Sequence, residues 1–173
     1  MKFKTTSAML LVMGAFSTGA AQANEGSGNV TFNGSIISAP CSIAPDSTDI
    51  DVNMGAVAAS AVNGGKTATP VPFVINLKDC TGQNSVVVKF GGTADQTNTN
   101  LLALQGGHAT GAGIQLMTGN GDAINLGEDS PEFDLDAGDQ TLRLQAALKG
   151  NSTTSVAVPG AFTSVANFTL AYN

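Results

Sequence analysis

Short runs in which apolar and polar residues alternate, separated by turn-forming residues, follow one another along most of the chain. Alternation with a period of two residues is the pattern of β-strands that bury one face. It predicts strands at residues 29–38, 49–52, 71–77, 86–90, 101–104, 114–117, 123–126, 141–149 and from 166 onward. Residues 54–62 are expected to form a helical turn or two. Roughly seven to nine short strands with turns between them predict an antiparallel β-sandwich.

The last run has no successor in this pattern. From Ala166 on, one face carries Ala166, Phe168, Leu170 and Tyr172, and no turn signal follows. We therefore expect a sandwich whose last strand is either closed by an earlier strand or left incomplete. An incomplete sandwich would need a strand from another molecule, because an uncovered apolar edge promotes aggregation.

The first run has a regular face of its own, formed by Val30, Phe32, Gly34 and Ile36. A glycine inside a strand lowers its stability and often marks the close approach of another backbone. Two interpretations remain open from the alternation alone. The run is either the first strand of a self-complete sandwich or a strand that pairs with another molecule.

The N-terminal segment is typical of a secretory signal peptide. Lys2 and Lys4 precede a short apolar run at residues 8–16, and Ala21 to Ala23 form a small-residue cleavage site. The apolar run is too short to cross a bilayer as a helix. We expect cleavage after Ala23, so that residues 1–23 are removed and one domain remains.

The exported chain is strongly acidic. The formal net charge of −6 becomes −8 once Lys2 and Lys4 leave with the signal peptide. Such a surface disfavours nucleic acid, which binds to basic patches, and disfavours adsorption to anionic lipid. We expect no nucleic-acid partner and no direct membrane insertion, and the acidity is best explained by solubility.

Two cysteines, Cys41 and Cys80, remain after export. An even count in an exported protein favours a disulfide, which would close a loop of about 40 residues and stabilise the fold by roughly 4 kcal/mol. A metal site is the alternative. With His108 as the single histidine and no second cysteine pair, the chain offers no tetrahedral ligand set. We expect a disulfide and no metal.

No motif predicts catalysis or a cofactor. His108 has no nucleophile and no orienting acid placed beside it by a motif. The acidic residues 128–139 lack the ligand spacing of an EF-hand. Gly111 to Gly113 lack the third glycine and the helix of a dinucleotide-binding fingerprint. We therefore expect a protein that is not an enzyme.

Three stretches resemble the major pilins of chaperone–usher fimbriae. They are VTFNGSII at residues 30–37 with APCSI at 39–43, FVINLKDC at 73–80, and residues 160–172 with a penultimate tyrosine. The likeness is to rod pilins of P pili and to major pilins of related enteric fimbriae. The signal peptide, the size and the two cysteines agree with it, whereas residues 84–149 are generic.

The resemblance implies an all-β, incomplete immunoglobulin-like antiparallel β-sandwich that lacks its final strand and is completed by a donor strand. Residues 24–38 would be the N-terminal extension and residues 39–173 the pilin domain. The implied donor face is Val30, Phe32, Gly34 and Ile36. The implied acceptor groove and terminal strand contain Phe162, Phe168, Leu170 and Tyr172, with Phe168 and Leu170 lining the groove and Tyr172 contributing to chaperone docking.

The function implied by the resemblance is that of a structural subunit of a fimbria. Such subunits polymerise head to tail by donor-strand exchange, form the rod and support cell adhesion through an adhesin elsewhere in the fibre. The implied partners are other pilin subunits, a periplasmic chaperone and an outer-membrane usher, and the implied location is the cell surface. The alternatives are a minor or adaptor pilin of the same system and a self-complete secreted adhesin domain.

Overall fold

The computed structural model describes residues 28–36, 38–81 and 85–173. The expected signal peptide, the cleavage bond after Ala23, and Ile37 lie outside these residues. The chain divides into two units, one that ends at Ile36 and a larger one from Ile37 to Asn173, called the domain below. The boundary predicted between residues 38 and 39 stays a prediction.

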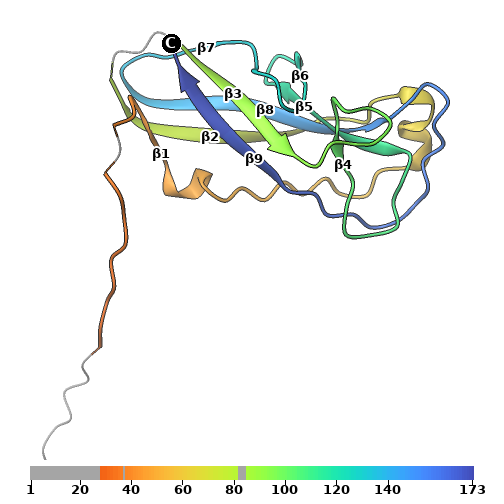
Figure 1. Ribbon diagram of the computed structural model, residues 1–173, viewed down its shortest axis with the longest axis horizontal. Helices are drawn as coiled ribbons and strands as arrows, with labels where there is room; N and C mark the ends of the chain where they lie inside the picture. Colours follow the sequence, from red (N-terminus) through yellow and green to blue (C-terminus); the bar gives the residue numbers. More distant parts are fainter. Residues whose placement is uncertain (1–27, 37, 82–84) are drawn as a thin grey trace, which may run out of the picture. The chain divides into compact units, whose positions relative to one another are not determined.

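The strands of the domain form two antiparallel sheets (Figure 1). The larger sheet has the order β1-β2-β8-β5-β4, with β6 paired to β5, and the smaller has the order β7-β3-β9. The strands are β1 Ser42–Ile43, β2 Val71–Cys80, β3 Ser85–Gly92, β4 Leu102–Ala103, β5 Ala112–Thr118, β6 Ala123–Ile124, β7 Phe133–Asp134, β8 Gly138–Gly150 and β9 Ala166–Tyr172. Three short 3-10 helices are η1 Pro45–Ser47, η2 Ala59–Ala61 and η3 Asn63–Gly65. The predicted all-β antiparallel sandwich is confirmed.

Strands β2 and β3 and the first half of β8 bury about every second residue, as expected of strands with one buried face, whereas β5 is buried throughout. Strands β2, β3 and β8 supply side chains that are at most 2% exposed: Ile75, Leu77, Val86, Val88, Leu142 and Leu144. The strands that carry this core were all predicted, because their alternation is strong. None of the helices in the described part of the chain is both long and apolar enough to cross a membrane.

Strand β9 lies at an edge. It pairs with β3 along its whole length, from Gly92 opposite Ala166 to Val86 opposite Tyr172. Among the described residues no strand pairs with its other side. The smaller sheet therefore ends at β9, and this edge positions the site described below.

The strand predicted at residues 49–52 is not formed. A strand needs a hydrogen-bonded neighbour, and residues 49–57 form no backbone–backbone hydrogen bond to any described residue. The helical turn or two expected within residues 54–62 is present as the single 3-10 turn η2. The acidic stretch at 128–139 contains the short strand β7, which the sequence did not indicate.

The N-terminal unit also has the alternation of a strand without the hydrogen-bonded pairing of one. The described residues 28–36 have no regular secondary structure, although they alternate as a strand does. The side chains of Val30, Phe32 and Ile36 are 76%, 90% and 104% exposed. This segment is therefore an apolar strand sequence without a strand partner.

Candidate functional site

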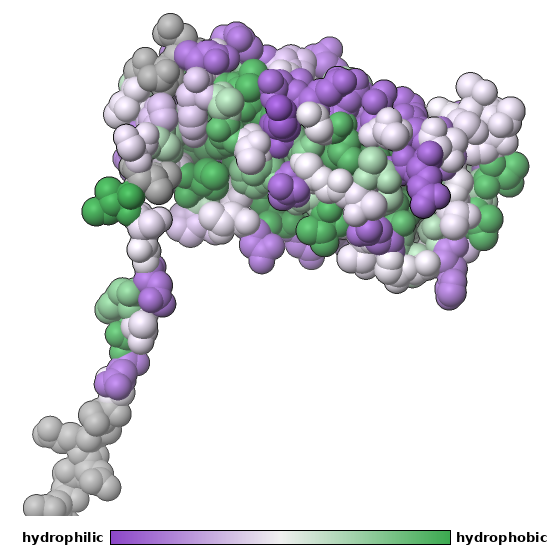
Figure 2. Space-filling model, viewed as in Figure 1, coloured by the Kyte–Doolittle hydropathy of each residue, from purple (hydrophilic) through white to green (hydrophobic). Residues whose placement is uncertain are grey.

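A long groove of about 1140 Å³ opens in the domain beside β9. One wall, called wall A here, consists of residues 48–55, which follow η1. The other wall, wall B, consists of residues 160–168, which lead into β9 and form its first half. The floor is apolar and is formed by Phe73, Phe90, Leu102, Ile114, Leu116 and Ala146. Figure 2 shows hydrophobic side chains gathered on this face of the domain.

Wall A has the alternation of a β-strand. Ile50, Val52 and Met54 are half-buried, and the residues between them, Asp49, Asp51 and Asn53, are exposed. Ile50 and Met54 pack against the core. Within the described ranges the backbone of residues 49–57 has no backbone hydrogen-bond partner on either side. Wall A is held in place by side-chain packing and offers an unpaired backbone to the groove.

Wall B and the rest of β9 have one edge that is hydrogen-bonded and one edge without a backbone hydrogen-bond partner among the described residues. Asn173 exchanges two backbone hydrogen bonds with Ser85, and Thr163 exchanges two with Gln105. In an extended chain successive residues direct their N–H and C=O groups to opposite edges. The backbone N–H and C=O groups of the odd-numbered residues point toward β3 and its neighbours, so those of the even-numbered residues point toward the groove. The side chains of the even-numbered residues from Phe162 to Tyr172 are half-buried.

Two close backbone approaches fix wall B before β9 begins. Gln105 bridges to Thr163, and Thr110 bridges to Val158. Gly160 sits between these bridges, and a Cβ at this position would lie 2.6 Å from the backbone nitrogen of Ala109. A side chain at Gly160 would therefore push wall B away from the rest of the domain.

A smaller cavity of about 220 Å³ shares Gly55, Gly160 and Phe162 with the groove. Its remaining lining is apolar except for Thr110 and includes Val57, Val62, Leu104, Leu148 and Ala157. Phe162 lines both spaces, so its half-buried ring stands where the groove meets the cavity.

The structure separates the four residues that the resemblance assigned to the acceptor side. Phe162 and Phe168 line the groove, and the Phe168 ring centroid lies 6.4 Å from that of Phe90. Leu170 and Tyr172 pack against the core further along β9 and are not part of the lining. Wall A was missed by the sequence reasoning, although the alternation of Asp49 to Met54 was a signal for it.

Tyr172 is the only tyrosine of the chain and has an unusual environment. Its hydroxyl oxygen is buried and forms no hydrogen bond to any described residue. Burial raises the pKa of the Tyr172 phenol above its ordinary value of 10.0, because the phenolate loses hydration.

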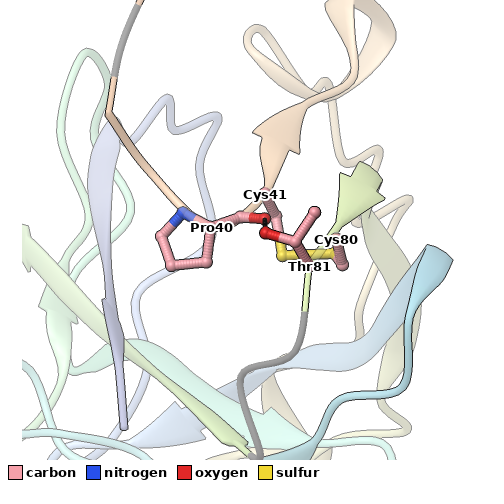
Figure 3. The surroundings of a disulfide bond; sticks show 4 residues. All are labelled: Pro40, Cys41, Cys80 and Thr81. Carbon is pink, nitrogen blue, oxygen red and sulfur yellow. Dashed lines mark hydrogen bonds between the residues drawn. A yellow bond between two sulfur atoms is a disulfide. The ribbon is translucent and has the colours of Figure 1, made fainter.

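The predicted disulfide between Cys41 and Cys80 is present, with the two Cα atoms 4.2 Å apart. Both cysteines are buried, at 3% and 4% exposure. The backbone N–H and the hydroxyl of Thr81 donate to the carbonyl of Pro40, at 2.9 and 3.3 Å, so a second link lies beside the disulfide (Figure 3). Together these contacts fix the N-terminal end of the domain to the end of β2.

Comparison with known proteins gives a consistent result. A family model described as fimbrial protein matches residues 30–173. Fimbria A protein of Serratia marcescens is 44% identical over 153 residues, which cover 87% of each chain. The major MR/P fimbria protein of Proteus mirabilis is 36% identical over 152 residues, which cover 87% of this chain and 86% of the relative.

Solved structures agree with the sequence relatives. A chain in the structure of a chaperone–usher pilus superposes with a TM-score of 0.75 at 28% identity, covering 89% of this chain and 100% of the other. The P pilus rod subunit PapA superposes with a TM-score of 0.67 at 27% identity, covering 78% of this chain and 100% of PapA. The chain therefore belongs to the fimbrial protein family, and within it to the major pilins of chaperone–usher fimbriae, which are structural subunits and not enzymes.

Proposed function

We propose that this pilin polymerises head to tail by inserting residues 30–36 of one copy into the groove of the next, and that the polymer is the rod of a surface fimbria. The observation that carries the proposal is the groove itself. Its two walls both have strand periodicity, and both direct unpaired backbone groups toward the space between them. An extended segment between them would satisfy both edges at once.

The length of the extension fits the groove. At about 3.3 Å per residue, residues 30–36 span roughly 20 Å, the same as residues 160–166 of wall B. Every strand pair in the domain is antiparallel, and an antiparallel insertion continues the smaller sheet beyond β9.

Side-chain size selects one register. In an antiparallel pair, directly opposite residues share a face. Inserted from the C-terminal end of β9 toward Gly160, the extension places large residues opposite small ones throughout: Val30 with Ala166, Phe32 with Ser164, Gly34 with Phe162 and Ile36 with Gly160. A shift of two residues in either direction puts Phe32 or Ile36 against Phe162. We infer that Gly34 is small because Phe162 occupies the space opposite it.

The tether favours insertion into a different copy. Cys41 is bonded to Cys80, the last residue of β2. Strand β2 ends at the same end of the domain as β9 (Figure 1). Ile36 precedes Cys41 by five residues, which reach at most about 18 Å, whereas Gly160 lies about 40 Å along an extended chain from Tyr172. A chain therefore cannot place its own Ile36 opposite its own Gly160, which argues against a self-complete domain.

The energetics suit a permanent joint. Burial of Val30, Phe32 and Ile36 contributes on the order of 5–8 kcal/mol before entropic costs. Each ladder hydrogen bond adds roughly 0.5–1.5 kcal/mol net. The contact is heterologous, so it propagates into a fibre instead of closing into a dimer.

The free groove also indicates a need for protection before assembly. Its apolar floor and two open backbone edges would aggregate if left uncovered. We infer that a periplasmic chaperone lends a strand to the exported subunit, with Tyr172 near its docking site, and that an outer-membrane usher exchanges this strand for the next extension. Support of adhesion would follow from the fibre and its adhesin. Relatives that are named as major pilins favour the rod subunit over a minor or adaptor pilin.

The test is expression of the mature chain in the periplasm with and without a cognate chaperone, followed by denaturing gels of unboiled samples. We expect recovery to depend on the chaperone and a ladder of heat-labile oligomers. A variant without residues 24–37 should still be recovered with the chaperone but should add no further subunits. A stable monomer that needs no chaperone, or a normal ladder from the truncated variant, would contradict the proposal.

A further inference from the structure

We propose that the Cys41–Cys80 disulfide conducts tension from the extension directly into β2 and thereby prevents wall A from being pulled out of the groove. This inference rests on the proposed head-to-tail polymer, because only there is each extension gripped by another copy. It assigns the disulfide a mechanical role in addition to the stability that any such cross-link provides.

Tension in a stretched fibre enters the domain at its N-terminal residues and continues along the strip from Cys41 to residue 57. The strip begins with β1, which pairs only Ser42 and Ile43 with β2. Three further bonds follow. The Ala44 N–H donates to the Asn76 carbonyl, and the Asn76 N–H donates to Ser47 Oγ, both at 2.9 Å; the Asn76 side-chain amide donates to Asp46 Oδ2 at 3.5 Å. The next part of the strip is wall A and the two residues after it. Within this part, residues 49–57 make no backbone–backbone hydrogen bond to the described domain.

Without the disulfide, the bonds of the strip would be loaded one after another from its end. Once β1 and Ser47 had separated from β2, nothing but side-chain packing would hold wall A. Wall A is one of the two surfaces that grip the extension of the neighbouring copy, so tension at one joint would weaken the next joint along the fibre.

The disulfide provides a covalent path around this strip. Cys80 is the last residue of β2, whose residues 71–77 pair with β8, and β8 in turn pairs with β5 in the middle of the larger sheet. The bond from Thr81 to the Pro40 carbonyl reinforces the same point. Cys41 and Cys80 are both buried, so the disulfide that carries the tension is shielded from solvent.

The position of the disulfide supports this role. Cys41 is the first buried residue of the described chain. A cross-link anywhere in the domain would constrain the unfolded chain. Because Cys41 lies between the extension and β1, the disulfide carries tension into β2 before it reaches β1 or wall A.

The test stretches single fibres of the full chain in optical tweezers and compares wild type with the C41S/C80S double variant. Release of the strip from Cys41 to residue 57 should lengthen each subunit of the variant by up to about 55 Å, at about 3.3–3.6 Å per residue. Wild-type fibres should lack this step. If the variant assembles no fibres, wild-type fibres stretched with and without a phosphine reductant give the same comparison.

The matched control is S47A, which weakens the strip but leaves the disulfide intact. We expect S47A fibres to extend like wild type, and S47A in the C41S/C80S background to release the strip at lower force than C41S/C80S alone. A strip released in oxidised S47A fibres, or no additional step after loss of the disulfide, would overturn the inference. Binding of a peptide of residues 28–36 to unloaded oxidised subunits is measured in parallel, and its failure would count against the proposed function instead.

Discussion

A side chain added at Gly34 tests the proposed register of the inserted strand. In that register Gly34 lies opposite Phe162, a half-buried ring where the groove meets the smaller cavity. Opposite Cβ atoms in an antiparallel pair are about 4.5–5.5 Å apart, so the methyl groups of a valine would have to enter the space of the ring. Overpacking of this kind destabilises by about 1–3 kcal/mol. The affinity of the extension for the groove should therefore fall roughly 5- to 150-fold in Gly34→Val.

A second substitution, in the groove, tests whether Gly34 and Phe162 lie opposite each other. Phe162→Ala opens the space opposite Gly34 and should recover about 1–2 kcal/mol of the binding that Gly34→Val loses. Phe162→Ala will also destabilise the domain, because the ring packs against the core. The comparison is therefore made between two peptides on the same Phe162→Ala domain, so that this destabilisation cancels.

The assay is the dissociation constant of a peptide of residues 28–37 for a domain without residues 24–37, from competition with a labelled wild-type peptide. The control peptide carries Ser35→Val, next to Gly34 but on the face that points out of the groove. It should bind within about threefold of wild type. The register is wrong if Gly34→Val and Ser35→Val weaken binding equally, or if Phe162→Ala discriminates against Gly34→Val as strongly as the wild-type groove does.

Three further predictions concern the assembled subunit. Replacing Cys41 and Cys80 with serine should lower the free energy of unfolding by roughly 4 kcal/mol, measured as a lower urea midpoint, and an unchanged midpoint would contradict the loop-closure argument. The Tyr172 pKa is raised by burial, so absorbance titration of this single tyrosine should have a midpoint above 10, and the free energy of unfolding should fall as pH rises above 10. Tyr172→Phe removes a buried hydroxyl that has no hydrogen-bond partner among the described residues, so it should be at least as stable at neutral pH and should show a smaller fall above pH 10, to which the raised pKa of Lys78 still contributes. In hydrogen exchange, the amides of Phe162, Ser164 and Ala166 should become protected when the peptide binds, together with amides of wall A, and protection of only one wall would refute insertion between them.

The parts of the fold that the sequence predicts best are those whose pattern is local. In β2 and β9 the alternation alone places apolar side chains on one face, and the structure has both strands over the expected residues. The disulfide was likewise predicted from the even number of cysteines in a chain that carries an export signal, and it is present. These features need no knowledge of what lies opposite them in space.

The features that the sequence did not predict depend on a distant partner. Strand β7 is defined by the pairing of Phe133 and Asp134 with Val86 and Ser85, and neither of its residues belongs to an alternating run. The groove lining extends from Phe168 back to Gly160, whereas Leu170 and Tyr172 pack against the core further along β9. The bridges of Val158 and Thr163 to residues 105–110, which place wall B, could not be inferred from local periodicity.

Wall A and the extension are the informative discrepancies, because both have strand periodicity and neither is a strand. A strand at the edge of a sheet has one free edge, and an isolated strand has two. Within the described part of the chain, wall B contributes one free edge to the groove and wall A an unpaired backbone, and residues 30–36 carry apolar side chains on one face and have no strand partner on either side. One insertion pairs all of these edges, and the tether prevents a chain from making it in the antiparallel register with its own groove. Under the proposed function, the unpaired edges of the domain are therefore the physical reason why one copy binds the extension of another.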